Sequence, residues 1–179
     1  MDFIRIYNKK NKYWKAIWNI YEESFPIFEQ RTIGNQEEVL KDDRYNCVAV
    51  LDKDFVVGII FYWKWDNYKY IEHLAIEKSL RGRNYGSKIL EKIYDDGEFV
   101  ILEIDPPVDK ISLKRLKFYE NKSFRLQEFN HVHPPYRKEF KGHKLKVMSY
   151  NKNLSLNEYN NFNDFLRNTV MKYSQDKNK

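Results

Sequence analysis

The fold follows from one stretch of the sequence, Glu72-His-Leu-Ala-Ile-Glu-Lys-Ser-Leu-Arg81-Gly-Arg-Asn-Tyr-Gly86-Ser87-Lys-Ile-Leu-Glu-Lys-Ile-Tyr94. Residues 70–76 are rich in apolar side chains and in residues that favour strands, which predicts a β-strand. From Ser87 onward, apolar residues recur at helical spacing, which predicts an amphipathic helix. Between strand and helix, residues 81–86 form a sharp basic turn.

This turn has the chemistry of a phosphate-binding loop. Gly82 and Gly86 let the backbone approach a ligand because they carry no Cβ, and Asn84 is one of the few other residues that tolerate a left-handed conformation. The free N–H groups and the positive dipole end of the following helix, together with Arg81 and Arg83, favour an anion. A plain strand–helix turn with solvated arginines is the alternative.

The order of elements around the turn resembles the GCN5-related N-acetyltransferase (GNAT) family. A strand, the basic turn, a helix, a second strand and a helix ending at Phe118-Tyr119-Glu120 precede another strand at Phe124. In that family, Arg/Gln-x-x-Gly-x-Gly/Ala binds the pyrophosphate of coenzyme A, and this chain matches the pattern at Arg81 and Gly86. It departs at Asn84, where the family usually has Gly. The resemblance extends over residues 4–149.

The resemblance implies both a fold and a cosubstrate. The expected fold is α/β (α+β), a GNAT fold whose central, mostly antiparallel twisted sheet has about seven strands flanked by helices, with an extra C-terminal helix. The expected cosubstrate is acetyl-CoA, with no metal. Its binding residues are expected to be Leu74, Ala75 and Ile76 through backbone N–H groups, the turn residues Arg81, Gly82, Arg83, Asn84, Tyr85, Gly86 and Ser87, and Ser112, where many relatives carry Asn.

The length of 179 residues predicts one domain over residues 1–179. Its core is expected at residues 3–150, a C-terminal helix at 155–173 and a frayed tail at 175–179. Ser155-x-x-Glu158 is a capping-box pattern, and the apolar residues after it keep helical spacing. We therefore expect this helix to dock on the body of the protein or on a second copy in a homodimer.

Hydrophobic periodicity predicts the remaining elements. Before the central strand we expect a strand at 3–7, helices at 13–24 and 35–41, and a hairpin of strands 45–51 and 55–63. After the central helix we expect a buried strand at 99–104 and a helix at 110–121 with Asp109 as its N-cap. A last pair of strands is expected at 124–132 and 145–150.

Composition favours a soluble cytoplasmic protein that does not enter a membrane. Cys47 is the single cysteine, so the chain has no internal disulfide, and neither an apolar signal segment nor a run of 18 apolar residues occurs in the sequence. The net charge of +6 raises the question of a nucleic-acid partner. However, 26 acidic residues are mixed among the 32 basic ones, so we do not expect nucleic acid to be the partner.

Acetyl transfer to an amine requires a base for the amine proton, a donor to the developing oxyanion and an acid for the leaving thiolate. Glu72 is the candidate base, because a carboxylate within a central strand is costly to bury without a task or a partner. A paired structural carboxylate is the alternative. Strand alternation is expected to place Glu72 on one face with Tyr70 and Leu74, and His73 on the opposite face.

Tyr119 stands where the family's phenolic general acid lies, so the resemblance implies that Tyr119 protonates the thiolate. A phenol with a pKa of about 10 suits a leaving group of comparable basicity. The alternative is a core tyrosine that packs with Leu116.

Two irregular segments are expected to border the acceptor. Glu29 and Arg31 are candidates in the first segment, where exposed loop charges are the alternative. In the second, Tyr136 and Arg137 follow two prolines and are candidates to hold a carboxylate or phosphate of the acceptor, since Arg binds such groups bidentately; a plain turn is the alternative. His131-Val132-His133 resembles part of a metal site, but no third ligand is apparent, so no metal is expected.

These observations predict an N-acetyltransferase that moves acetyl from acetyl-CoA to a primary amine by direct transfer in a ternary complex. The acceptor is not identified by the sequence, although a small molecule is favoured over a protein. Two alternatives from other classes stay open. One is an acyl-CoA-binding module that has lost catalysis, and the other is a basic nucleic-acid-binding protein, which no recognisable motif favours.

Overall fold

The computed structural model describes residues 1–94 and 97–175. Its elements in chain order are β1 (Asp2–Arg5), α1 (Trp14–Ser24), η1 (Ile27–Glu29), α2 (Ile33–Val39), β2 (Tyr45–Asp52), β3 (Phe55–Trp65), β4 (Tyr68–Ile76), η2 (Lys78–Leu80), α3 (Tyr85–Tyr94), β5 (Phe99–Ile104), α4 (Lys110–Glu120), β6 (Phe124–Leu126), β7 (His131–His133), β8 (His143–Tyr150), α5 (Leu156–Asn168) and η3 (Val170–Tyr173).

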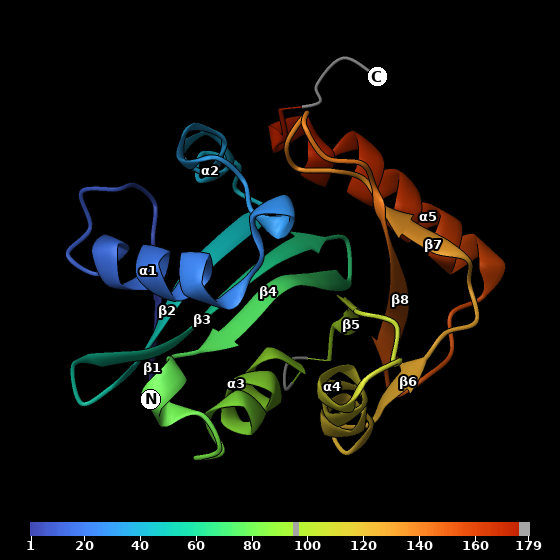
Figure 1. Cartoon of the computed structure of the whole chain (residues 1–179), viewed down its shortest axis with the longest axis horizontal. Helices are drawn as coiled ribbons and strands as arrows, with labels where there is room; N and C mark the ends of the chain where they lie inside the picture. Colours follow the sequence, from blue (N-terminus) through green and yellow to red (C-terminus); the bar gives the residue numbers. More distant parts are fainter. Residues whose placement is uncertain (95–96, 176–179) are drawn as a thin grey trace.

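Within these ranges the strands form an eight-stranded sheet in the order β1-β2-β3-β4-β5-β8-β6, with β7 also paired to β8 (Figure 1). The pairing of β4 with β5 is parallel, and the other pairings are antiparallel. The predicted class, a mostly antiparallel sheet flanked by helices, is confirmed, with one strand more than expected.

Helices cover both faces of this sheet (Figure 1). On one face, α1 and α5 contribute fully buried side chains such as Ile17 and Phe162 to a single apolar cluster. On the other face, α3 and α4 contribute Leu90 and Tyr119 to a second cluster. The central strands are thus packed on both faces. This packing holds their backbone and their side chains in fixed positions.

Two helices, α4 and α5, begin at the N-caps that the sequence predicted. Asp109 accepts a hydrogen bond from the amide of Ser112 at 3.0 Å, and Ser155 accepts one from the amide of Glu158 at 3.2 Å. Both form capping boxes, at the starts of α4 and α5. The C-terminal helix packs on the body of the protein, one of the two placements expected. Its Phe162 and Leu166 are fully buried there.

The last strands differ from the prediction. Instead of one strand over residues 124–132, the short strands β6 and β7 pair with different halves of β8. Leu126 lies opposite Met148 and His131 lies opposite Leu145, so residues 127–130 face only residues 146 and 147. Four residues cannot pair with two, so the chain leaves the hydrogen-bonded pairing with β8 between β6 and β7. The Gln127 side chain instead donates to Ser149 Oγ at 2.9 Å.

Among the described helices, none is long and apolar enough to cross a membrane. Of the predicted frayed tail, residues 176–179 lie outside the described residues.

Candidate active site

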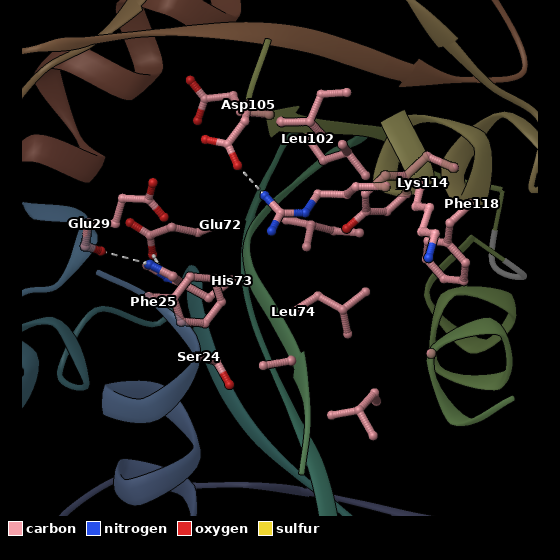
Figure 2. A pocket seen from close by; sticks show the side chains of 18 of the residues that line it. Ser24, Phe25, Glu29, Glu72, His73, Leu74, Leu102, Asp105, Lys114 and Phe118 are labelled. Carbon is pink, nitrogen blue, oxygen red and sulfur yellow. Dashed lines mark hydrogen bonds and ion pairs between the residues drawn. The ribbon is translucent and has the colours of Figure 1, made fainter. Parts of the chain in front are cut away.

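The two parallel strands separate and leave a cavity between them. Their pairing runs from Tyr68 opposite Phe99 to Ile71 opposite Leu102, after which β4 continues to Ile76 and β5 to Ile104 without pairing to each other. A cavity of about 790 Å³ opens there, lined by β4, the end of β5, the basic turn, α4 and parts of residues 133–145. Figure 2 shows Leu74, Leu102 and Phe118 around it.

The open edge of β4 presents alternate backbone amides to this cavity. The Ala75 carbonyl is directed at β3, since it lies 2.7 Å from where a Cβ on Gly58 would stand. Because N–H and C=O directions alternate along an antiparallel ladder, Leu74 and Ile76 direct their amides away from β3. Leu74, Ala75 and Ile76 all line the cavity, but the amide expected from Ala75 faces the neighbouring strand.

The basic turn has the backbone that its residues predicted. Gly82 has φ +80°, and Asn84, as expected, holds a left-handed conformation with φ 65°. Helix α3 begins at Tyr85, two residues before the predicted start at Ser87. The Lys88 amide donates to the Asn84 carbonyl at 3.2 Å, so the amides just before it belong to the unpaired first turn of the helix.

Side chains of the turn are also held in place. Arg81 donates through Nε to the Ile76 carbonyl at 3.1 Å and through Nη2 to Ser24 Oγ at 3.2 Å. The Tyr85 hydroxyl donates to Asp52 at 2.6 Å. The turn residues that line the cavity are Arg81, Gly82, Asn84, Tyr85, Gly86 and Ser87, whereas Arg83 does not.

Tyr119 lines the same cavity from α4. Its ring packs near Phe124, with ring centroids 5.7 Å apart. Burial raises the pKa of its hydroxyl to about 12. No residue in the described ranges forms a hydrogen bond with this hydroxyl. The hydroxyl oxygen is nevertheless not buried, since it is absent from the set of buried polar atoms that have no partner. The hydroxyl therefore opens onto the cavity.

Ser112 lies elsewhere than the resemblance implied. Its hydroxyl accepts hydrogen bonds from the amides of Val108 and Asp109, at 3.1 and 3.0 Å, as part of the capping box. The residue is 3% exposed and does not line the cavity. The capping role occupies the polar group that a cofactor contact would need.

Glu72 is the bulge residue of β4. On β3, Phe61 and Tyr62 are adjacent, but their partners on β4 are His73 and Ile71, so Glu72 has no partner. A bulge shifts the alternation of side chains by one residue. Glu72 and His73 therefore both face the α1 side, where His73 packs on Tyr21, and the expectation that they lie on opposite faces is wrong.

Glu72 lines the cavity, but its carboxylate is buried and has three polar partners. Arg31 Nη2 lies 2.6 Å from Oε1, and neither side chain is exposed at all. Tyr136 donates to Oε1 at 2.7 Å, and Trp63 donates to Oε2 at 3.2 Å. Burial alone would raise the pKa of Glu72, but the charge of Arg31 and these hydrogen bonds lower it. This is the environment of the alternative, a paired structural carboxylate.

The two arginines expected near the acceptor do not line the cavity. Arg31 is fully buried, where it also donates to the carbonyls of Tyr173 and Val170 at 3.2 and 3.3 Å. Arg137 donates to the Gln30 carbonyl at 3.0 Å. Neither lines the cavity, although Tyr136 and Glu29 do.

Glu29 lines the cavity on the side that faces α4. Figure 2 places it beside Glu72 and His73, across from Lys114 and Phe118. Its side chain is 22% exposed, and its Oε1 lies 3.9 Å from Nε2 of His143. Burial, reinforced by the charge of Asp105, raises the pKa of Glu29 to about 7. A carboxylate of this kind takes up and releases a proton near neutral pH.

Glu103 is a functional candidate that the sequence reading missed. It lines the cavity from the end of β5, where it contacts the rings of His131 and His133. The two histidines do share one face, as predicted, but they meet a carboxylate. In the described part of the chain, no group of three or more His, Cys, Asp or Glu is placed to hold a metal ion. The available signal in the sequence was a single carboxylate within the apolar strand 99–104.

Comparison with known families finds one match over most of the chain. The model of the acetyltransferase (GNAT) family matches residues 11–120. A curated Bacillus subtilis protein, "Putative acetyltransferase YjbC", is 28% identical over 114 residues, which are 60% of this chain and 57% of that protein. The chain thus spans little more than half of this relative's length.

Solved structures extend the likeness to the whole fold. A protein from Bacteroides thetaiotaomicron, named "Putative acetyltransferase from GNAT family", has a TM-score of 0.87 and 26% identity, covering 96% of this chain and 98% of that one. An aminoglycoside 6'-N-acetyltransferase complexed with coenzyme A has a TM-score of 0.58 at 14% identity, covering 83% of this chain and 96% of that one. The second likeness concerns the fold alone.

Proposed function

The chain belongs to the acetyltransferase (GNAT) family, and we propose that it transfers acetyl from acetyl-CoA to a primary amine, directly within a ternary complex. The observation that carries the proposal is one cavity that joins three features. These are the basic turn, the phenol of Tyr119 and the titratable carboxylate of Glu29, all of which line the same cavity. A small amine is favoured over a protein as the acceptor, because the carboxylate lies inside the cavity.

The basic turn fits a pyrophosphate group. Gly82 and Asn84 bend the backbone so that it leaves open space, with nothing within 4 Å of a Cβ built on Gly82. Arg81, which is held by the Ile76 carbonyl and Ser24, lines the cavity together with the first residues of α3 and supplies a cation there. The solved aminoglycoside acetyltransferase is complexed with coenzyme A. In this chain, the turn would bind the pyrophosphate of the same coenzyme. When bound, acetyl-CoA supplies an activated acetyl group.

Backbone amides of β4 and the hydroxyl of Tyr119 would then act on the thioester of acetyl-CoA. The amides of Leu74 and Ile76 face the cavity and would donate to the oxygen on which negative charge develops. Tyr119 would give its proton to the departing sulfur, and its hydroxyl keeps that proton at neutral pH because burial raises its pKa to about 12.

The base is proposed to be Glu29. It is accessible from the cavity, and its pKa of about 7 lets it accept a proton at physiological pH. The role expected for Glu72 stays a prediction, which its ion pair with Arg31 does not favour. A variant at each position separates the two, because only the base controls the pH dependence of the rate.

Thermal unfolding with and without acetyl-CoA tests the proposal. A ligand at a hundred times its Kd should stabilise the folded chain by about 2.7 kcal/mol. We expect Arg81→Ala to weaken this shift and Arg83→Ala, a matched change outside the cavity lining, to weaken it less. No shift for the unaltered protein would refute the proposal. Binding with no thiol release toward any amine would instead indicate an acyl-CoA-binding module.

A further inference from the structure

A series of contacts links the C-terminal helix to the cavity. The Tyr159 hydroxyl on α5 lies 3.0 Å from Nδ1 of His131, and Nε2 of the same ring contacts Glu103 Oε1. Glu103 lines the cavity. The strands β7 and β5 therefore meet at this carboxylate, and α5 reaches it through His131.

The imidazole of His131 lies between the Tyr159 hydroxyl and the Glu103 carboxylate. The carboxylate only accepts, so it requires a hydrogen on Nε2, and the hydroxyl can then donate to Nδ1 of the neutral ring. The two contacts together hold the ring beside Glu103. The Tyr159 ring is held independently of its hydroxyl, because it stacks on Phe129 with ring centroids 4.1 Å apart.

Glu103 keeps its negative charge in this setting. Its Oε2 accepts a hydrogen bond from Tyr70 and lies 3.8 Å from Nε2 of His133. Burial on its own would raise the pKa of Glu103, but His133, His131 and Tyr70 together lower it to about 2. The carboxylate is therefore ionised at neutral pH. Its side chain is only 5% exposed, but the partners named here are histidines and a tyrosine, whereas the charge of Glu72 is balanced by Arg31.

Cations that might bind an acceptor carboxylate are engaged elsewhere. Arg31 pairs with Glu72, and Arg137 donates to the backbone, both outside the cavity lining. Arg115 lines the cavity but pairs with Asp105. Lys114 lies on the side of Phe118, away from Glu29 (Figure 2). His133 and His143 also line this part of the cavity, and burial lowers the pKa of His143, which favours its neutral form. The end around Glu29 and Glu103 thus presents carboxylates and imidazoles to the acceptor.

We propose that this end of the cavity binds an ammonium group that has no carboxylate beside it, that Glu103 is the binding carboxylate, and that His131 and Tyr159 position it. The proposal rests on the proposed transferase function, for which it names the acceptor class. An α-amino acid would bring its own carboxylate next to Glu103 and Glu29, where like charges repel. An amine or an amide of the same shape would not.

Calorimetric titration of the coenzyme A-loaded protein tests this with a matched pair of probes. L-Phenylalaninamide and L-phenylalanine share the ring and the ammonium group and differ in the carboxylate. We expect the amide to bind about tenfold more tightly and Glu103→Gln to remove the preference. Tyr159→Phe keeps the stacked ring and is expected to weaken amide binding by about threefold.

Tyr173→Phe is the matched control. It removes another phenol hydroxyl from the C-terminal segment, one that donates to Asp42 at 3.0 Å and not to the cavity, so binding should not change. Equal binding of both probes, no binding of either, or a preference that survives Glu103→Gln would overturn the proposal. An unchanged affinity in Tyr159→Phe would refute the positioning role even if Glu103→Gln does not fold.

A titration with coenzyme A alone in the same instrument keeps the two proposals apart. Coenzyme A binding without amide binding refutes the acceptor class and leaves the transferase proposal standing. Amide binding without coenzyme A binding refutes the transferase proposal, and the acceptor class that rests on it falls as well.

Discussion

Arg31 and Glu72 form an ion pair of 2.6 Å in which neither side chain is exposed to solvent. The pair joins the segment after α1 to the bulge of β4, and Arg31 continues to the carbonyls of η3. Three parts of the chain depend on one guanidinium. The pair therefore helps to hold β4 in place where it borders the cavity.

Breaking this pair is expected to destabilise the protein severely. Arg31→Ala leaves a buried carboxylate without its partner, which costs about 3–5 kcal/mol. Chemical denaturation measures the loss. The exposed pair of Lys9 with Glu37, at 2.8 Å, is the control, since Lys9→Ala should cost about 0–1 kcal/mol. Similar small losses for both variants would show that the buried pair contributes little.

Tyr119→Phe is expected to lower kcat by about 10²–10⁴ and leave the unfolding temperature unchanged. The reason is that the hydroxyl faces the cavity and has no hydrogen-bond partner in the described part of the chain. Thiol release at saturating acetyl-CoA gives the rate, and a thermal scan gives the stability. A variant with normal kcat would exclude Tyr119 as the general acid.

Glu29 should give the rate its pH dependence. A base acts when deprotonated, so kcat/KM is expected to rise with pH through a pKa of about 7. Glu29→Gln should remove this rising limb, and Glu72→Gln should keep it. Rates of thiol release between pH 5 and about 9 make the comparison. A rising limb that persists in Glu29→Gln and disappears in Glu72→Gln would restore Glu72 as the base.

The same group predicts how stability changes with pH. The folded state raises the pKa of Glu29 from 4.5 to about 7, so it binds the proton more tightly than the unfolded chain does. Stability from this group is therefore greatest below pH 4.5 and decreases as the pH rises toward 7. Glu29→Gln should be less sensitive to pH within that window, as measured by denaturation at several pH values.

Asn84 tests the backbone of the basic turn. At φ 65°, a β-branched residue is strained by about 1–2 kcal/mol, so Asn84→Val should weaken acetyl-CoA binding. Asn84→Gly relieves the same strain and should bind as well as the unaltered protein. Equal binding by both variants would show that this conformation is not needed for the ligand.

Short-range patterns predicted much of the fold and the backbone of the basic turn. The turn at Asn84 and the caps at Asp109 and Ser155 depend on residues a few positions apart, and all three are as expected. The bulge at Glu72 was not predictable, because an extra residue shows only in the register against β3. Glu103 was missed for a related reason, since its partners come from β7 and β4.

The region that matches the family ends at residue 120. It includes the anion-binding turn and Tyr119, whereas His131, His143 and Tyr159 come after it. The groups proposed to handle the acceptor therefore come from both sides of that boundary. Glu29 and Glu103 lie inside the matched region, whereas His131 and Tyr159, which would position Glu103, lie beyond it. Two members of the family that share every residue of the matched region can thus still differ in how the carboxylate at position 103 is held.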